Sequence, residues 1–413
     1  MKKLFPLLLL FSLLLAGCAG FLQPVRIGSR PLPVPPAEEV AVEPERSAPA
    51  ISEPAPAVCE PAPAVCEPAP AVHEPAPAVF APTPDLADTA VYLDGSVLPA
   101  FWQGQAIYVR LHDYVALTGG SCTLTLPVQT GQAAVCTVQL ANGAHRTVST
   151  DGSLLCDGES AYLPLDTVLS WTDGWYLADP EQDALYCSTA PRGVLSPGYA
   201  VPVLMYHAVS DDCWGERSLF VSPAALEEQL IFLLENGYTP IWITELPMLA
   251  QYEKPVILTF DDGYADNYTE LLPLLERYGV KATIFIITDK IGAPRYLTAE
   301  QLRELADSGL VSIQSHTVTH PLLDTLSEEA LRRELSESQL AIARLTGRVP
   351  TALSYPVGHE SPLVRQIAAE YYDFGILMDG WCFYTDRDPM GITRYFVGRD
   401  TDIWTFRDMA RGS

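Results

Sequence analysis

Basic residues are scarce in this chain. It has 25 lysines and arginines against 51 acidic residues, and its formal net charge is −26 over 413 residues. A surface that binds DNA or RNA needs basic side chains to neutralise phosphates, so this composition argues against nucleic acid as a partner. Divalent cations and neutral or cationic glycans remain compatible with an acidic protein. No segment of the sequence implies a protein partner.

A long apolar run is also missing from the N-terminal segment. The run from Leu4 to Leu15 is shorter than the roughly 20 residues that cross a bilayer. It follows two lysines and ends at Leu15-Ala16-Gly17-Cys18, which is the arrangement of a secretory signal. This tetrapeptide resembles a bacterial lipobox. The resemblance implies a lipoprotein signal peptide over residues 1–18, a lipid on Cys18 that anchors the protein to the membrane, and an extracytoplasmic location. A plain secretory signal is the alternative.

The nine cysteines lack the close paired spacing of a zinc knuckle. Four of them lie between residues 122 and 187. Outside the cytosol these four could pair as disulfides, or they could remain buried thiols; the sequence leaves both open.

Residues 19–87 are dominated by Pro, Ala, Val and Glu. A heptapeptide recurs four times, beginning at Glu53, Glu60, Glu67 and Glu74. Closely spaced prolines remove amide donors and fix φ, so helix and sheet are both disfavoured. We expect a disordered, extended linker here.

Residues 88–190 predict a small β-rich domain built by duplication. Asp94-Gly95-Ser96 is echoed by Asp151-Gly152-Ser153, and the strand pattern from Ala106 is echoed from Ala161, each followed by a short helical stretch. The spacing loosely resembles the copper-amine-oxidase N-terminal-like domain. Its aromatic residues either stack on sugar rings or form the core of the domain: Trp102, Trp171, Trp175 and Tyr176.

The next segment alternates apolar strands with amphipathic helices, which predicts an α/β fold with a parallel sheet or barrel. Chemistry in such folds lies at the carboxyl ends of strands. The strand pattern Pro255 to Phe260 ends in Asp261-Asp262-Gly263. Two adjacent carboxylates repel each other unless a cation or a proton compensates them. A divalent metal is the natural candidate.

Histidines supply the other ligands that a metal would need. His316 and His320 follow a later strand pattern, and their i, i+4 spacing predicts that both imidazoles lie on one face of a helical turn. Together with one carboxylate they would leave a coordination position open for water. His207 follows the first strand pattern of this region.

These segments resemble the polysaccharide deacetylases, carbohydrate esterase family four, also called the NodB-homology domain. The likeness covers residues 199–409 and implies a distorted (β/α) barrel. Thr259 to Gly263 is similar to the first family motif, which makes Asp261 the general base and Asp262 a metal ligand. His316 to His320 is similar to the second motif, which supplies two histidine ligands. Tyr355-Pro356-Val357-Gly358 stands at the third, where the Val357 amide would stabilise the oxyanion.

The sequence departs from the family pattern in two places. Leu353 and Ser354 stand where an arginine usually precedes the third motif, so we expect Arg394 to pair with the base instead. The usual general-acid histidine near the C-terminus is missing too. Val203 to His207 resembles the N-terminal motif of the poly-N-acetylglucosamine deacetylases, which implies that His207 is the acid; His359 is the competing candidate.

The resemblance implies a metal-dependent hydrolase that removes N-acetyl groups from N-acetylglucosamine units of peptidoglycan or poly-N-acetylglucosamine. Zinc, cobalt and nickel all suit two histidines and one carboxylate, and zinc is the first expectation. Two alternatives remain. One is hydrolysis of O-acetyl esters, as in xylan esterases of the same family, and the other is a glycan-binding wall protein without catalysis.

Overall fold

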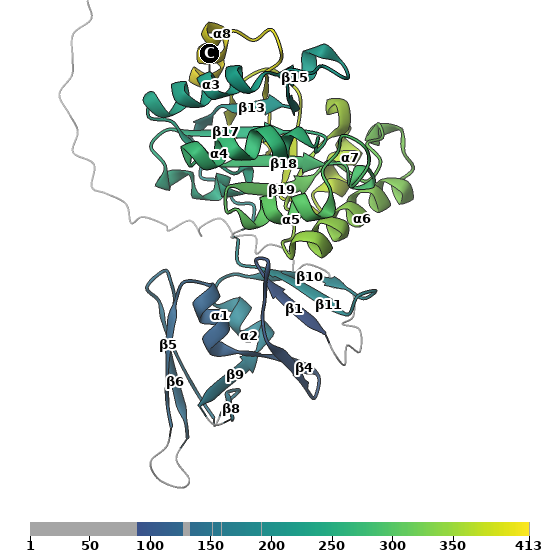
Figure 1. Ribbon diagram of the computed structural model, residues 1–413. Helices are drawn as coiled ribbons and strands as arrows, with labels where there is room; N and C mark the ends of the chain where they lie inside the picture. The colour runs from purple at the N-terminus through teal and green to yellow at the C-terminus, as the bar shows by residue number, and fades with distance from the viewer. Residues whose placement is uncertain (1–88, 127–132, 151, 158, 191, 413) are drawn as a thin grey trace, which may run out of the picture. The chain divides into compact units, whose positions relative to one another are not determined.

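The computed structural model describes residues 89–126, 133–150, 152–157, 159–190 and 192–412 (Figure 1). The expected signal peptide, Cys18 and the Pro-rich linker lie outside the described residues. Within the described part, no helix has the length and apolar character needed to cross a bilayer.

Residues 89–190 form three small antiparallel or mixed sheets and two short helices. The sheet orders are β10-β11-β1-β2, β3-β4-β9-β8 and β5-β6-β7. The strands are β1 (Ala90–Leu93), β2 (Ser96–Val97), β3 (Ala100–Gln103), β4 (Ala106–Arg110), β5 (Ser121–Thr125), β6 (Val135–Gln139), β7 (His145–Ser149), β8 (Leu155–Asp157), β9 (Ser160–Pro164), β10 (Trp175–Asp179) and β11 (Ala184–Ser188), and the helices are α1 (Leu111–Leu117) and α2 (Leu165–Ser170).

The repeated strand and helix of this region are present. Strand β4 leads into α1, β9 leads into α2, and the two strands pair antiparallel with Val109 opposite Leu163. Trp102, Trp171 and Tyr176 pack against the buried hydrophobic cluster of this region. This agrees with the interpretation in which these aromatic residues form the core of the domain. The six described cysteines are free thiols.

The second region is a mixed α/β fold around a curled parallel sheet. Its strand order is β21-β20-β19-β18-β17-β13-β23, with β16 beside β17. The strands are β12 (Ala200–Val201), β13 (Val203–Tyr206), β14 (Ala208–Val209), β15 (Phe220–Val221), β16 (Thr239–Ile241), β17 (Pro255–Phe260), β18 (Ala282–Ile286), β19 (Val311–Ser315), β20 (Ala352–Ser354), β21 (Phe374–Ile376), β22 (Phe383–Tyr384) and β23 (Tyr395–Phe396).

The segment from Ile392 to Phe396 joins the two edges of this sheet. Ile392 forms a parallel bridge with Ile376 beside β21, and Tyr395 pairs with Leu204 of β13. The sheet therefore curls into a half-barrel whose edges are brought together by one short segment.

Helices pack around this sheet (Figure 1). They are α3 (Pro223–Glu235), α4 (Leu272–Tyr278), α5 (Ala299–Asp307), α6 (Glu328–Thr346), α7 (Pro362–Ala368) and α8 (Ile403–Arg411). Helix α3 begins at Pro223, because the Ser222 hydroxyl caps its first turn and proline is favoured at the first helical position.

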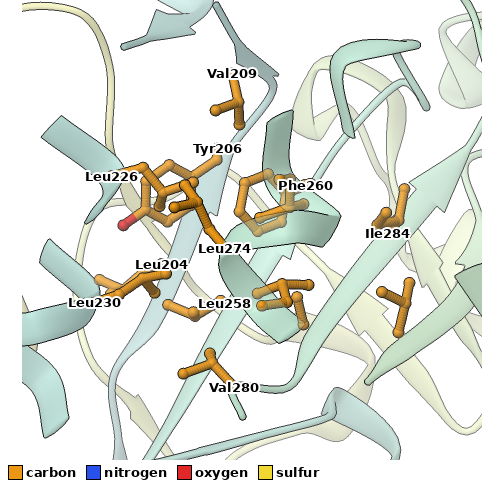
Figure 2. Packing of buried hydrophobic residues seen from close by; sticks show 14 of the residues in the cluster. Leu204, Tyr206, Val209, Leu226, Leu230, Leu258, Phe260, Leu274, Val280 and Ile284 are labelled. Carbon is orange, nitrogen blue, oxygen red and sulfur yellow. The ribbon is translucent and has the colours of Figure 1, made fainter. Parts of the chain in front are cut away.

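Alternation along the strands divides the core into two layers. Leu204, Leu258 and Ile284 belong to one buried cluster with residues of α3 and α4. Figure 2 shows Leu204 and Leu258 near Leu226, Leu230 and Leu274, with Ile284 farther along the sheet. Their neighbours Val203, Ile257 and Phe285 belong to a separate cluster that fills the concave side. Side chains at the carboxyl ends of the strands are left to form a site.

Candidate active site

Two segments, each directly after a strand, bring the three expected metal ligands together. Asp262 follows β17, whereas His316 and His320 lie in the loop after β19. One ligand atom from each residue lies within 4.8 Å of the others. The Asp262 Oδ1 is 3.5 Å from His316 Nε2 and 3.9 Å from His320 Nε2.

These separations fit a divalent ion. Zinc bonds to nitrogen and oxygen are about 2.0–2.2 Å, so tetrahedral ligands lie roughly 3.4 Å apart. The His316 Nδ1–H donates to the backbone oxygen of Ser354 at 2.8 Å, so in the neutral imidazole the free lone pair is on Nε2, which lies 3.5 Å from the Asp262 Oδ1. The donor set and its tautomer therefore suit a metal.

The sequence-based expectation of a helical turn across the two histidines is wrong. Strand β19 ends at Ser315, and residues 316–320 form an irregular loop. Thr317 and His320 have φ of 67° and 62°, which is the left-handed region. A tight left-handed turn, rather than one turn of an α-helix, brings the imidazoles together, with ring centroids 4.6 Å apart.

Asp261 is held by Arg394. The carboxylate is 2% exposed, and the two guanidinium nitrogens donate to its two oxygens at 2.8 Å each. Burial alone would raise the pKa of Asp261, but the adjacent Arg394 outweighs it and holds the pKa well below its ordinary value. Asp261 is therefore ionised and fixed in orientation at neutral pH.

Arg394 directly precedes β23, and its side chain lies in the protein interior. It is fully buried, its Nε donates to the Leu377 oxygen at 2.8 Å, and it also donates to the Thr259 hydroxyl at 3.1 Å. It is therefore not a surface arginine. The contact expected with Asp261 is present.

Ser354 is a site residue that sequence reasoning missed. Its hydroxyl donates to Asp261 at 3.2 Å and accepts from Arg394 at 3.0 Å, while its backbone oxygen orients His316. The only sequence signal was its place in front of the third motif, where it stands instead of the family arginine.

His207 directly follows β13 beside Asp261. Tyr206 pairs with Phe260, and the Asp261 amide donates to the Tyr206 oxygen at 2.9 Å. The imidazole is 8% exposed, and burial lowers its pKa. Its Nδ1 has no hydrogen-bond partner within the described residues. His359, by contrast, is half exposed, and its Nδ1 lies 3.5 Å from Asp324.

Val357 lies in the 3-10 turn Pro356–Gly358, with φ of 58° and a side chain 53% exposed. Half of the eight described non-glycine residues with positive φ belong to this site: Asp262, Thr317, His320 and Val357. Residues with such strained backbone cluster at functional sites and persist only where the surrounding structure stabilises them.

Gly263 is needed beside Asp262, since its φ is 77° and a Cβ there would lie 2.9 Å from Ile286.

Comparisons with known proteins show that this region is similar to polysaccharide deacetylases. The family model described as polysaccharide deacetylase matches residues 250–372. That segment contains the Asp261-Asp262 pair, both histidines and Val357, but neither His207 nor Arg394.

Two curated relatives illustrate the likeness. YxkH of Bacillus subtilis (strain 168), assigned to the polysaccharide deacetylases, is 40% identical over 203 residues, which are 48% of this chain and 71% of that protein. The poly-beta-1,6-N-acetyl-D-glucosamine N-deacetylase of Escherichia coli (strain K12) is 32% identical over 134 residues, which are 28% of this chain and 20% of that protein.

A solved structure from Bacillus anthracis, likewise assigned to the polysaccharide deacetylases, has 22% sequence identity and a TM-score of 0.50. The match covers 70% of this chain and 99% of that one. At this identity the likeness shows the fold alone.

Proposed function

The chain belongs to the polysaccharide deacetylase family, and we propose that it removes N-acetyl groups from N-acetylglucosamine units of an envelope polysaccharide, using a bound divalent metal. The observation that carries this proposal is the cluster of Asp262, His316 and His320 beside the ionised Asp261. In this proposal the curled sheet serves as the distorted (β/α) barrel of the family.

The metal site itself would be formed by the carboxylate of Asp262 and the two Nε2 atoms of His316 and His320. When bound, a divalent ion such as zinc polarises an acetyl carbonyl and lowers the pKa of a water molecule. Cobalt or nickel would suit the same donors.

The protein's own groups then handle the protons. Asp261 accepts a proton from the water that attacks the acetyl carbon, and Arg394 keeps this carboxylate ionised and oriented. The Val357 amide would donate to the oxyanion that develops on the carbonyl oxygen. When the carbon–nitrogen bond breaks, the departing amine takes a proton from His207 in its imidazolium form. The proton that Asp261 took from the water then restores this imidazolium, so the two residues neither gain nor lose a proton over the cycle. The products are acetate and a glucosamine unit.

The substrate class rests on chemistry and on the relatives. The Escherichia coli relative is by name a deacetylase of poly-beta-1,6-N-acetyl-D-glucosamine, and a Listeria monocytogenes relative, 31% identical over 140 residues, acts by name on peptidoglycan N-acetylglucosamine. Each is matched over 28% of its length or less. We propose one of these two glycans as substrate, with the protein anchored at the outer face of the membrane through a lipid on Cys18.

The test is acetate release from a panel of glycans by the full chain. The panel contains poly-N-acetylglucosamine, peptidoglycan, chitooligosaccharides and acetylated xylan, and the controls are Asp261→Asn and His316→Ala. We expect release from an N-acetylated glycan and its loss in both variants. Release from acetylated xylan alone would favour the esterase, and glycan binding without any release would favour the non-catalytic alternative.

A further inference from the structure

The loop from His316 to His320 has an unfavourable backbone that the rest of the protein must hold in place. Two of its residues, Thr317 and His320, adopt left-handed φ without being glycine. Such a backbone is unfavourable for a residue with a side chain and persists only where surrounding contacts stabilise it. The contacts on this loop therefore decide whether both imidazoles face Asp262.

One anchor of the loop is a carboxylate on a different element. Glu334 lies in the second turn of α6, and its Oε2 accepts from the amides of Val318 and Thr319 at 2.9 Å each. Its Oε1 accepts from the Thr319 hydroxyl at 2.7 Å. Hydrogen bonds to an ionised acceptor are roughly twice as strong as neutral ones. Glu334 thus holds the middle of the loop with three such bonds.

Backbone and local contacts hold the remaining parts of the loop. The amides of Thr288 and Asp289 donate to the oxygens of Thr317 and Val318, at 3.1 and 3.0 Å. The Thr317 hydroxyl accepts from the His320 amide at 3.0 Å. Two of these contacts involve backbone atoms only, so a side-chain substitution on α6 leaves them intact. The contribution of Glu334 can therefore be removed separately.

We propose that Glu334 is a positioning residue that sets the metal affinity of this site. Glu334 is not one of the three residues whose ligand atoms converge. It acts through the backbone of Val318 and Thr319, which fixes the separation and direction of His316 and His320. This inference rests on the proposed function, because it requires that the cluster binds a divalent metal.

The geometry predicts different results for two substitutions. Both loop amides donate to the same oxygen of Glu334, so in Glu334→Gln a single amide oxygen can still accept from both. The new NH₂ group would face the Thr319 hydroxyl, which can accept a hydrogen bond. Glu334→Ala removes all three contacts. Glu337→Ala is the matched control, since Glu337 is exposed and lies on the same helix.

The experiment measures Zn²⁺ affinity of the metal-free full chain by competition with a chromophoric chelator, together with the visible absorption of the Co²⁺ form. We expect Glu334→Ala to weaken Zn²⁺ binding about 10- to 100-fold, the usual effect of losing a partner that orients a ligand. Glu334→Gln should stay close to the wild type, and Glu337→Ala should match it. In the metal-free protein, amide exchange at residues 318 and 319 should accelerate in Glu334→Ala alone.

An unchanged Zn²⁺ affinity and Co²⁺ spectrum in Glu334→Ala would overturn this inference and leave the proposed function intact. Equal weakening in Glu337→Ala would also overturn it, because the effect would then belong to α6 as a whole. If the wild-type chain itself bound no divalent metal, the proposed function would fail together with this inference.

Discussion

At the scale of single residues, the buried ion pair of Asp261 and Arg394 is the contact whose loss should destabilise the folded state most. Neither side chain is more than 3% exposed, so removing one partner leaves the other charge uncompensated in the protein interior. The pair is expected to matter for stability as well as for the orientation of the base.

We predict that Arg394→Met lowers the free energy of unfolding by about 3–5 kcal/mol, the usual cost of breaking a buried ion pair. Denaturant unfolding checks this. Arg365→Met is the control, because the ion pairs of Arg365 with Glu360 and Asp388 are partly exposed and should contribute roughly 1 kcal/mol or less. Equal losses in the two variants would contradict the buried-pair account.

Asp266 gives a prediction about pH. Its Oδ1 accepts from the Val209 amide and from Asn267, but burial outweighs these bonds and raises the pKa of Asp266 to about 6. A carboxyl whose pKa is raised on folding contributes stability below its unfolded pKa, and this contribution is lost as pH rises through the folded value. Asp266 therefore favours the folded state in acid and destabilises it above about pH 6.

We predict that Asp266→Asn raises the free energy of unfolding by roughly 3 kcal/mol at pH 8, and that this gain disappears below about pH 4. Denaturant unfolding of the variant and the wild type across this range isolates the effect from all other titrating groups. A difference that does not change with pH would show that Asp266 ionises in the folded protein as it does in the unfolded chain.

Several of these residue contacts could be expected from sequence, and others could not. The apolar strand pattern before Asp261 and Asp262 predicted their place at a strand end. Arg394 was expected to pair with the base because Leu353 and Ser354 stand where the usual arginine would be. The hydrogen bonds of Ser354 with Asp261 and Arg394 were missed, because a single uncharged serine does not mark a catalytic site in a sequence. Glu334 looked like an ordinary exposed charge of an amphipathic helix, because its partners are backbone amides that no sequence pattern marks.

At the scale of elements, strands and helices follow closely from periodicity and capping, whereas the loops after the strands do not. Helix α5 (Ala299–Asp307) and strand β19 (Val311–Ser315) are examples of the expected alternation of amphipathic helices with apolar strands. The loop from His316 to His320 was misassigned as a helical turn, because i, i+4 spacing is equally compatible with a tight left-handed turn. Tertiary contacts decide between them.

The turn at Val357 allows a prediction about backbone strain in a loop after a strand. A β-branched residue at φ of 58° and ψ of 15° is strained by about 1–2 kcal/mol relative to a residue that tolerates this region. We predict that Val357→Asn raises the free energy of unfolding by about 1 kcal/mol and retains acetate release, because the backbone amide is unchanged. Denaturant unfolding and an acetate assay measure the two effects.

Two further variants sharpen this test. Val194→Asn is the stability control, since Val194 is exposed and is not among the residues with positive φ. Val357→Pro should abolish acetate release, because proline has no amide hydrogen and cannot adopt this φ. Full activity in Val357→Pro would exclude the amide from the reaction.

At the scale of the whole molecule, the site draws on parts of the chain that are far apart in sequence. The site residues from His207 to Arg394 span nearly two hundred positions. His207, the Asp261-Asp262 pair, the two histidines and Val357 follow parallel strands that end at one edge of the sheet, whereas Arg394 precedes β23 and reaches Asp261 with its long side chain. The α/β class and the location of the site were predictable from the alternation of strands and helices. The joining of the two sheet edges by Ile392 to Phe396 was not, because short edge strands leave little periodic signal.

The central claim is that Asp262 and the two histidines bind the metal while Asp261 handles the proton. The most direct measurement compares Zn²⁺ content with acetate release in the full chain, in Asp261→Asn and in His316→Ala, after chelation and titration with Zn²⁺. We predict that acetate release by the wild type rises with Zn²⁺ up to one ion per chain. Asp261→Asn should bind Zn²⁺ but release no acetate, and His316→Ala should lose both. Acetate release by the chelated wild type, or by Asp261→Asn, would contradict this division of roles.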